Sequence, residues 1–290
     1  DVGLTAEDLK ILPAINFSVQ NLFINGRDLG QISGATLPLT SGIEIHDFNW
    51  KNPYINLTGG SNWEFNDFHM SGHIDGKDYG KALDLLGVSS FLSQTQGTLD
   101  FDLAWQGGVT TPDVKTLEGK VNFNLTDGML LNVNPGISRL LGLFSLEAMS
   151  RRLSFNFQDM THKGLAFNTL KGSYVLLDGV ATTDGVSMTG PALNLNLKGS
   201  INIPEKTLDQ AVLISPQLGS SVAIVAAILG GPIVGVAAWL ADHILSDTLF
   251  KNTGLTYHLY GPWDKPEFKI ENQNHTKSAS LASQKDLAHA

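Results

Sequence analysis

Residues 97–105 read GTLDFDLAW, and residues 119–125 read GKVNFNL. In each stretch a hydrophobic side chain alternates with a polar one, so an extended backbone places all of the hydrophobic side chains on one side. This period of two is typical of a β-strand that buries one face and leaves the other in water. The two stretches therefore predict half-buried strands.

The same alternation recurs along much of the chain. Residues 153–157 read LSFNF and residues 193–203 read LNLNLKGSINI, while the N-terminal third alternates less regularly around 15–24 and 43–45. Turn signals separate these stretches at short intervals, namely TDG at 126–128, LDG at 177–179, DG at 184–185 and GP at 190–191. Short strands joined by tight turns predict a mainly β fold with antiparallel strands, in contrast to the βαβ units of parallel sheets.

The composition excludes several classes of protein. Of the 290 residues 42% are hydrophobic and 16% are charged, and acidic residues outnumber basic ones 28 to 19, which gives a net charge of −9. Without a basic surplus to neutralise phosphates, the chain is not expected to bind nucleic acid. The absence of cysteine rules out disulfides, zinc–thiolate sites and thiol nucleophiles. No G-x-S-x-G, Walker or G-x-G-x-x-G motif is present, so we expect neither an enzyme nor a bound cofactor.

Acidic residues and histidines share one side of a predicted strand at Asp67, His69, His73 and Asp75. Such side chains can bind metal ions. Four residues of strand separate the Cα atoms of the two histidines by about 13 Å, too far for both to bind one ion without ligands from elsewhere. We therefore expect these side chains to face solvent near a turn, and we expect no metal site.

Three stretches interrupt the strand pattern and predict helices, near residues 78–91, 135–149 and 219–250. The third lies in the most apolar part of the chain, since residues 210–241 contain no charge. Gly-Gly-Pro at 230–232 breaks that part, so it predicts an apolar hairpin of two shorter helices instead of one straight helix. The hairpin either packs on the sheet as a cap or inserts into a membrane, and the side chains that would do so are Ile224, Ile228, Val234 and Trp239.

We expect residues 1–270 to form a single domain. Residues 271–290 are small and polar without any period, which predicts a disordered tail. Arg151 and Arg152 follow the helix predicted near 135–149, where they either meet a phosphate headgroup or interact with the helix dipole.

The possible functions differ in what covers the hydrophobic face of the sheet. Two sheets can cover each other in a sandwich, one sheet can close into a barrel, or a strongly curved sheet can keep an apolar groove that a lipid fills. The alternation fits all three arrangements, and on frequency alone the sandwich is favoured.

Residues 119–183 resemble the C-terminal region of the YhdP proteins, which belong to the AsmA-like group that includes TamB. The similarity rests on the order and spacing of short motifs, which are GISRLLGL at 136–143, RRL at 151–153, SPQL at 215–218, GGP at 230–232 and GPWDKP at 261–266. The resemblance implies a long curved antiparallel sheet, shaped like a taco, with an apolar interior. It further implies a protein of the Gram-negative envelope that is anchored in the inner membrane and reaches through the periplasm, with this end near the outer membrane.

For this chain the resemblance implies non-enzymatic transport of phospholipid between the inner and outer membranes through a periplasmic β-groove. The residues expected to line the groove are Leu99, Phe101, Leu103, Val121, Phe123, Leu125, Phe155, Leu193, Leu195 and Leu197. The expected partners are phospholipid and outer-membrane or other envelope proteins. The alternative is a structural or assembly factor that binds outer-membrane proteins by strand addition to a free sheet edge.

Overall fold

The structure, a computed structural model, describes residues 13–88, 91–108, 111–131, 164–217, 255–263 and 266–271. Most of these residues belong to β-strands. In chain order the elements are β1 (Ile15–Val19), β2 (Phe23–Ile24), β3 (Arg27–Asp28), β4 (Gln31–Leu39), β5 (Gly42–Lys51), β6 (Ile55–Glu64), β7 (Asp67–Gly76), α2 (Tyr79–Leu85), β8 (Leu92–Ser93), β9 (Gln96–Gly108), β10 (Thr111–Leu131), β11 (Gly164–Leu177), β12 (Val180–Thr189), β13 (Leu193–Asn202), β14 (Thr207–Pro216), β15 (Leu255–Pro262) and β16 (Glu267–Glu271).

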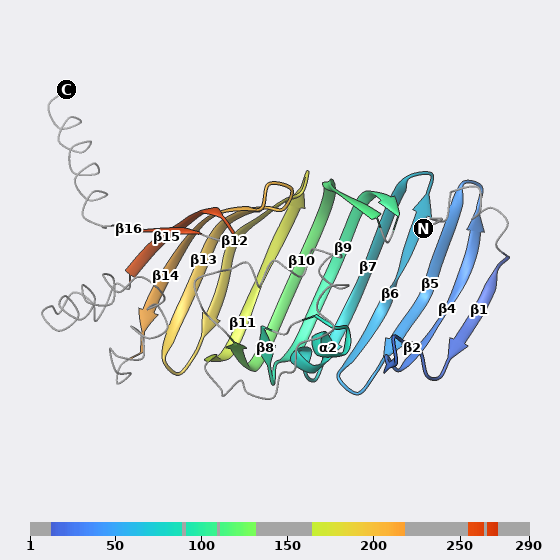
Figure 1. Ribbon diagram of the computed structural model, residues 1–290, viewed down its shortest axis with the longest axis horizontal. Coiled ribbons are helices and arrows are strands. Elements are labelled where there is room, and N and C mark those ends of the chain that lie inside the picture. The colour runs from blue at the N-terminus through green and yellow to red at the C-terminus, as the bar shows by residue number, and fades with distance from the viewer. Residues whose placement is uncertain are drawn as a thin grey trace, which may run out of the picture.

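One antiparallel sheet contains 14 of these strands (Figure 1). Its order is β1-β4-β5-β6-β7-β9-β10-β11-β12-β13-β14-β15-β16, and the short strand β8 pairs with β10. Strands that follow each other in the chain are neighbours at almost every step, so the predicted antiparallel meander is confirmed. The two-stranded hairpin β2–β3 is separate, and among the described strands no second sheet covers the large one. This part of the chain is therefore one open sheet that ends at β1 and β16, and not a sandwich.

The sheet has an apolar and a polar face because direct partners in an antiparallel ladder project to the same side. A row of direct partners on the apolar face crosses from β7 to β15 and consists of Ile74, Leu99, Phe123, Gly172, Val186, Leu197, Val212 and Tyr257. The adjacent row on the polar face begins with His73, Asp100, Asn122 and Ser173. Hydrophobic and hydrophilic side chains are thus separated across the whole width of the sheet.

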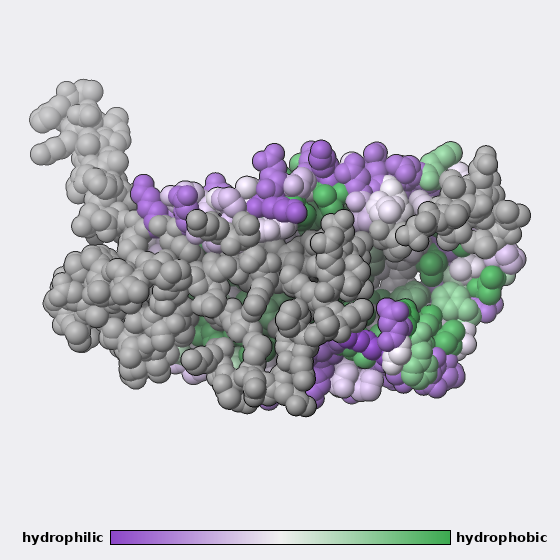
Figure 2. Space-filling model, viewed as in Figure 1, coloured by the Kyte–Doolittle hydropathy of each residue, from purple (hydrophilic) through white to green (hydrophobic). Residues whose placement is uncertain are grey.

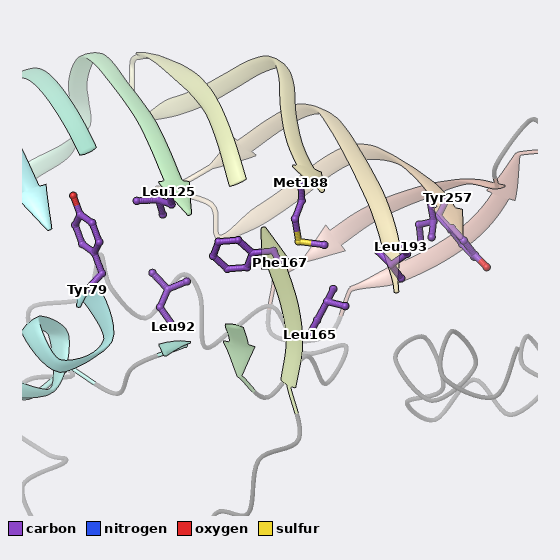
Figure 3. Close-up of a cluster of buried hydrophobic side chains, with 9 residues drawn as sticks. Tyr79, Leu92, Leu125, Leu165, Phe167, Met188, Leu193 and Tyr257 are labelled. Carbon is purple, nitrogen blue, oxygen red and sulfur yellow. The ribbon is translucent and has the colours of Figure 1, made fainter. Parts of the chain in front are cut away.

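The sheet curves around its apolar face, so that the strands arch over the side chains buried there (Figure 3). The largest buried group, which we call the main cluster, consists of Tyr79, Leu92, Leu125, Leu165, Phe167, Met188, Leu193, Ile214 and Tyr257. Two smaller clusters form around Leu176 and around Leu208. The hydroxyl of Tyr174 on β11 interacts with the side chain of Gln210 on β14 although two strands lie between them. In a flat sheet these strands would be about 14 Å apart, so the interaction requires strong curvature.

The helix predicted near 78–91 is present but shorter, since α2 covers only Tyr79–Leu85. The Asp78 carboxylate caps its N-terminus by accepting a hydrogen bond of 3.1 Å from a backbone N–H of the first turn. Gly87 then adopts the left-handed conformation that commonly terminates helices, with φ of +77°. Phe91 therefore lies beyond the helix, just before the chain returns to the sheet in β8.

The TDG stretch at 126–128 does not form the predicted turn, because β10 continues through it. Asp127 adopts a left-handed conformation with φ of +51°, which Asp tolerates better than most residues. The strand twists there without reversing its direction. Gly128 has no side chain, and the ring of Phe167 occupies the space that a Cβ would need. The DG signal at 184–185 likewise lies inside β12, where it coincides with a bulge.

Other predicted elements lie outside the described residues. They are the helix near 135–149, the apolar helical hairpin near 219–250, and the tail beyond residue 271. Within the described part of the chain, no helix is long and apolar enough to span a membrane.

Tyr79 and Tyr257 provide a matched test of the main cluster. Among the described residues, the buried Tyr257 hydroxyl has no hydrogen-bond partner, whereas the Tyr79 hydroxyl donates to the Ile74 carbonyl oxygen at 3.2 Å. We expect Tyr257→Phe to raise the free energy of unfolding by about 1 kcal/mol, because it removes an unsatisfied buried group. Tyr79→Phe should lower it by about 1 kcal/mol, because it removes a hydrogen bond. Urea unfolding at pH 7 measures both changes, and a less stable Tyr257→Phe variant would contradict this account of the cluster.

Candidate functional site

All nine predicted groove residues that the structure describes lie on the apolar face. They come from β9, β10 and β13, and they are Leu99, Phe101, Leu103, Val121, Phe123, Leu125, Leu193, Leu195 and Leu197. Leu99 is the direct partner of Phe123, and Phe101 is the direct partner of Val121, so these side chains form continuous rows. Each of the nine is buried or half-buried.

Most of these nine residues pack against the protein's own core. Leu125 and Leu193 are members of the main cluster, with exposed fractions of 7% and 0%. Five more pack against buried clusters, and they are Leu99, Leu103, Val121, Phe123 and Leu195. Phe101 and Leu197 join none of the clusters of the described residues. The face predicted to form the groove at β9–β13 is therefore largely filled by protein side chains.

The apolar face continues onto β4–β7, which were not predicted to line the groove. The half-buried hydrophobic residues there belong to none of the buried clusters, and they are Ile32, Ile43, Ile45, Phe48, Trp50, Leu57, Trp63 and Met70. A bulge at Asp47, which has φ of +52°, shifts the alternation between Ile45 and Phe48 by one residue. A strict odd–even pattern therefore breaks within β5, and this break hid the continuation of the face.

We call the apolar face of β1 and β4–β7 the open section. None of its paired positions carries a charged side chain. Figure 2 shows hydrophobic residues at the right of the molecule, where β1 to β6 lie, and hydrophilic residues along the lower edge there and along the upper edge of the middle of the molecule. Ile15 and Val19 of β1 expose 44% and 38% of their surface. Such a surface suits a neutral apolar ligand and offers nothing that would bind a charged one.

Glycines lower the floor of the open section. Gly59 and Gly72 are direct partners, and Gly34 lies in the same row on β4. The Phe101 ring lies over Gly72, with its Cζ only 2.7 Å from the point where a Cβ would stand. The Phe17 ring covers Gly34 in the same way. Glycines in a strand often mark a place where a ring, a backbone or a ligand approaches closely, and here phenylalanine rings of the same face lie over two of them.

The polar face carries the histidines that were considered as metal ligands. His73 Nδ1 lies 2.6 Å from Asp100 Oδ1, and His69 Nε2 lies 2.7 Å from Asp102 Oδ1. Each histidine thus pairs with its own carboxylate near solvent, where the alternation had placed it. Among the described residues, no group of three or more His, Cys, Asp or Glu side chains could hold a metal ion.

The polar groups in the buried part of the apolar face include the hydroxyls of Tyr174 and Tyr257 and the side chain of Gln210. Burial raises the pKa of Tyr257 to about 12. Burial also raises the pKa of Tyr174, although the side chain of Gln210 opposes this shift. Both phenols therefore stay neutral at physiological pH. In the paired rows of this face, the described residues present no ionised group that could serve as a nucleophile or general base.

The remaining predicted site residues lie outside the described part of the chain. They are Phe155, the possible headgroup ligands Arg151 and Arg152, and the cap or membrane-contact residues Ile224, Ile228, Val234 and Trp239.

Comparison with known proteins agrees with the sheet and its uncharged apolar face. Residues 4–268 match the family model described as YhdP protein. The chain belongs to the YhdP family. It is 31% identical over 241 residues to the intermembrane phospholipid transporter YhdP of Escherichia coli (strain K12), a match that covers 81% of the chain. Because the match covers 19% of that relative, the chain spans about a fifth of the length of this YhdP protein. No solved structure matches the chain significantly.

The contact between Gly72 and Phe101 can be tested by a double-mutant cycle. Gly72→Ala should lower the free energy of unfolding by about 2 kcal/mol, because the new methyl group overlaps the Phe101 ring and the Thr58 carbonyl oxygen. In a Phe101→Ala background the same change should cost at least about 1 kcal/mol less, because the ring is gone. Gly185→Ala is the control, since no atom lies within 4 Å of the position of its Cβ. Urea unfolding measures the stability of wild type, of the two single variants, of the double variant and of the control. Additive effects of the two substitutions would show that Gly72 and Phe101 do not meet.

Proposed function

We propose that this chain is a section of a periplasmic conduit that moves phospholipid between the inner and outer membranes of a Gram-negative envelope, without enzymatic activity. The observation that supports this function best is the open section, an uncharged apolar surface that no second sheet covers among the described strands. The name of the Escherichia coli relative, an intermembrane phospholipid transporter, supports the same function.

The physical basis of the proposal is the cost of moving acyl chains through water. Each methylene group removed from water contributes about 0.8 kcal/mol, so covering ten of them offsets about 8 kcal/mol. An apolar surface achieves this without a specific pocket, because acyl chains carry no polar groups. The headgroup can remain in water at the hydrophilic edges seen in Figure 2, so no charge has to be buried.

The chain would provide one part of a longer path. The Escherichia coli relative is about five times as long as the segment it shares with this chain. We assign this section to the end near the outer membrane, because residues 119–183 and the GPWDKP motif at 261–266 resemble the C-terminal region of the family.

Leu57 and Thr58 allow a sharp test of lipid binding. They are adjacent in β6, and Leu57 projects from the apolar face whereas Thr58 projects from the polar face. The purified chain is incubated with vesicles of phosphatidylethanolamine and phosphatidylglycerol, re-isolated, and extracted for mass spectrometry. Wild type and Thr58→Asp should retain phospholipid, whereas Leu57→Asp should retain at least about tenfold less, because its carboxylate would be desolvated beside an acyl chain.

Thermal melting of the same variants controls for folding. Both should melt within a few degrees of wild type, because neither side chain belongs to a buried cluster. Equal lipid in the two variants, or no lipid in the wild type, would contradict the proposed function.

A second candidate function, assembly of outer-membrane proteins by strand addition, is supported by the free edge of β1. This strand pairs only with β4 among the described strands, and its sequence, INFSV, is uncharged. An unprotected edge of this kind can accept a strand from another protein. Binding of an outer-membrane strand peptide that Phe17→Pro abolishes, together with absence of phospholipid, would favour this second function.

A further inference from the structure

The apolar face of the sheet is divided into two parts that differ in how they are covered. Every member of the three buried clusters, and every side chain packed against them, comes from residue 74 or later. The open section contributes only Ile74, at the end of β7, to these clusters, although two other residues of its face, Ile55 and Phe68, expose only 6% of their surface each. The two parts have the same hydrophobic chemistry, so the difference lies in what covers them.

The boundary between the parts is marked by α2 and β8, which lie at one end of β7, β9 and β10 (Figure 1). The ring of Tyr79 lies over Gly76 of β7, and its hydroxyl is 3.3 Å from the Gly97 carbonyl oxygen of β9. Leu92 follows in β8, which pairs with β10. Figure 3 shows both side chains beside Leu125 under the arch of the sheet. Helix and strand thus place protein side chains where a continuous groove would otherwise run.

We propose that acyl chains occupy only the open section, and that Tyr79, Leu92 and the main cluster close the groove on the C-terminal side of β7. The proposal rests on the function proposed above and specifies where the cargo lies. It makes β1 and β4–β7 the binding site and assigns β9–β15 a structural role. Of the nine residues predicted to line the groove, five belong to the main cluster or pack against it and two more pack against the cluster around Leu176, so these seven lie outside the proposed binding site.

The dimensions of the open section suit an acyl chain. From β1 to β7 there are four steps between neighbouring strands, which amount to about 19 Å across the strands. The hydrocarbon core of a bilayer is about 30 Å thick, so the acyl chain of one leaflet extends over about 15 Å. One chain therefore fits between the outer edge of β1 and the Tyr79 ring.

The chemistry of the open section favours an acyl chain over a peptide strand. A peptide backbone must find hydrogen-bond partners when it leaves water. The backbone groups within this section pair with neighbouring strands in the plane of the sheet, so the face itself offers none. An acyl chain needs no partners, and the section carries no charge that would oppose it.

Photo-crosslinking from two phenylalanine positions tests the division directly. Phe48 and Phe123 both project from the apolar face, but Phe48 belongs to the open section and Phe123 packs against the main cluster. Benzoylphenylalanine replaces each in turn in the full 290-residue chain, which is irradiated with phosphatidylethanolamine–phosphatidylglycerol vesicles. We expect at least about tenfold more crosslinked phospholipid from position 48 than from position 123. Equal crosslinking would overturn the division while leaving lipid binding intact, whereas no crosslink at either position, with no extractable lipid, would overturn the proposed function itself.

Natural tryptophans give a second measurement in case the bulky label at position 123 disturbs folding. Trp50 lies in the open section, held by a hydrogen bond of 2.7 Å from its Nε1 to the Leu29 carbonyl oxygen. Trp263 packs against the cluster around Leu208 in the other part. Variants that keep one of these two tryptophans, with the other four changed to Phe, are mixed with vesicles whose acyl chains are brominated. Quenching should be at least about twofold stronger for Trp50, and equal or stronger quenching of Trp263 would overturn the division.

Discussion

The structure depends on one constraint, which is that every antiparallel pairing keeps the hydrophobic residues of both strands on the same face. A slip of one residue at any pairing would turn a whole strand over and put its hydrophobic side chains into water. The sheet absorbs local irregularities without such a slip, because extra residues are placed in bulges. Asp47 in β5 is such a residue, and its left-handed conformation restores the apolar row between Ile45 and Phe48. The same constraint makes the apolar face continuous from β1 to β15.

The sequence predicts the strands well where the alternation is strict and less well where the backbone departs from it. The alternation at 97–105 and 193–203 corresponds to β9 and β13, and the LDG signal at 177–179 joins β11 to β12 as expected. TDG at 126–128 has the same turn chemistry, yet it lies inside β10. Local chemistry allows a left-handed residue at both places, and only the long pairing of β10 with β9 and β11 decides that the chain continues. The shortened helix has a similar explanation, since a single glycine, Gly87, ends it before its apolar pattern does.

The covering of the apolar face could not be read from the alternation. Leu57 and Phe123 lie in the same row of direct partners, but Phe123 packs against the main cluster and Leu57 does not. The difference arises from residues distant in sequence, because α2, β8 and the curvature of β11–β15 bring side chains together over one part of the face only. The curvature is accompanied by bulges and by polar links such as Tyr174 to Gln210, which join strands that are not neighbours. None of these has a period that a sequence pattern would reveal.

A half-exposed apolar surface carries a cost that the folded chain does not remove by itself. The strands β4–β6 carry hydrophobic residues like those that pack around Leu193, but these residues join none of the three buried clusters. The floor there carries Gly34, Gly59 and Gly72, which contribute no side-chain contacts of their own, and the rings of Phe17 and Phe101 lie over two of them. The apolar face of this section carries glycines and large hydrophobic residues, and the charged residues lie on the opposite face. Such a surface suits a neutral, apolar ligand whose shape can vary. We therefore interpret the open section as a surface that binds and releases an apolar ligand, and not as an incomplete hydrophobic core.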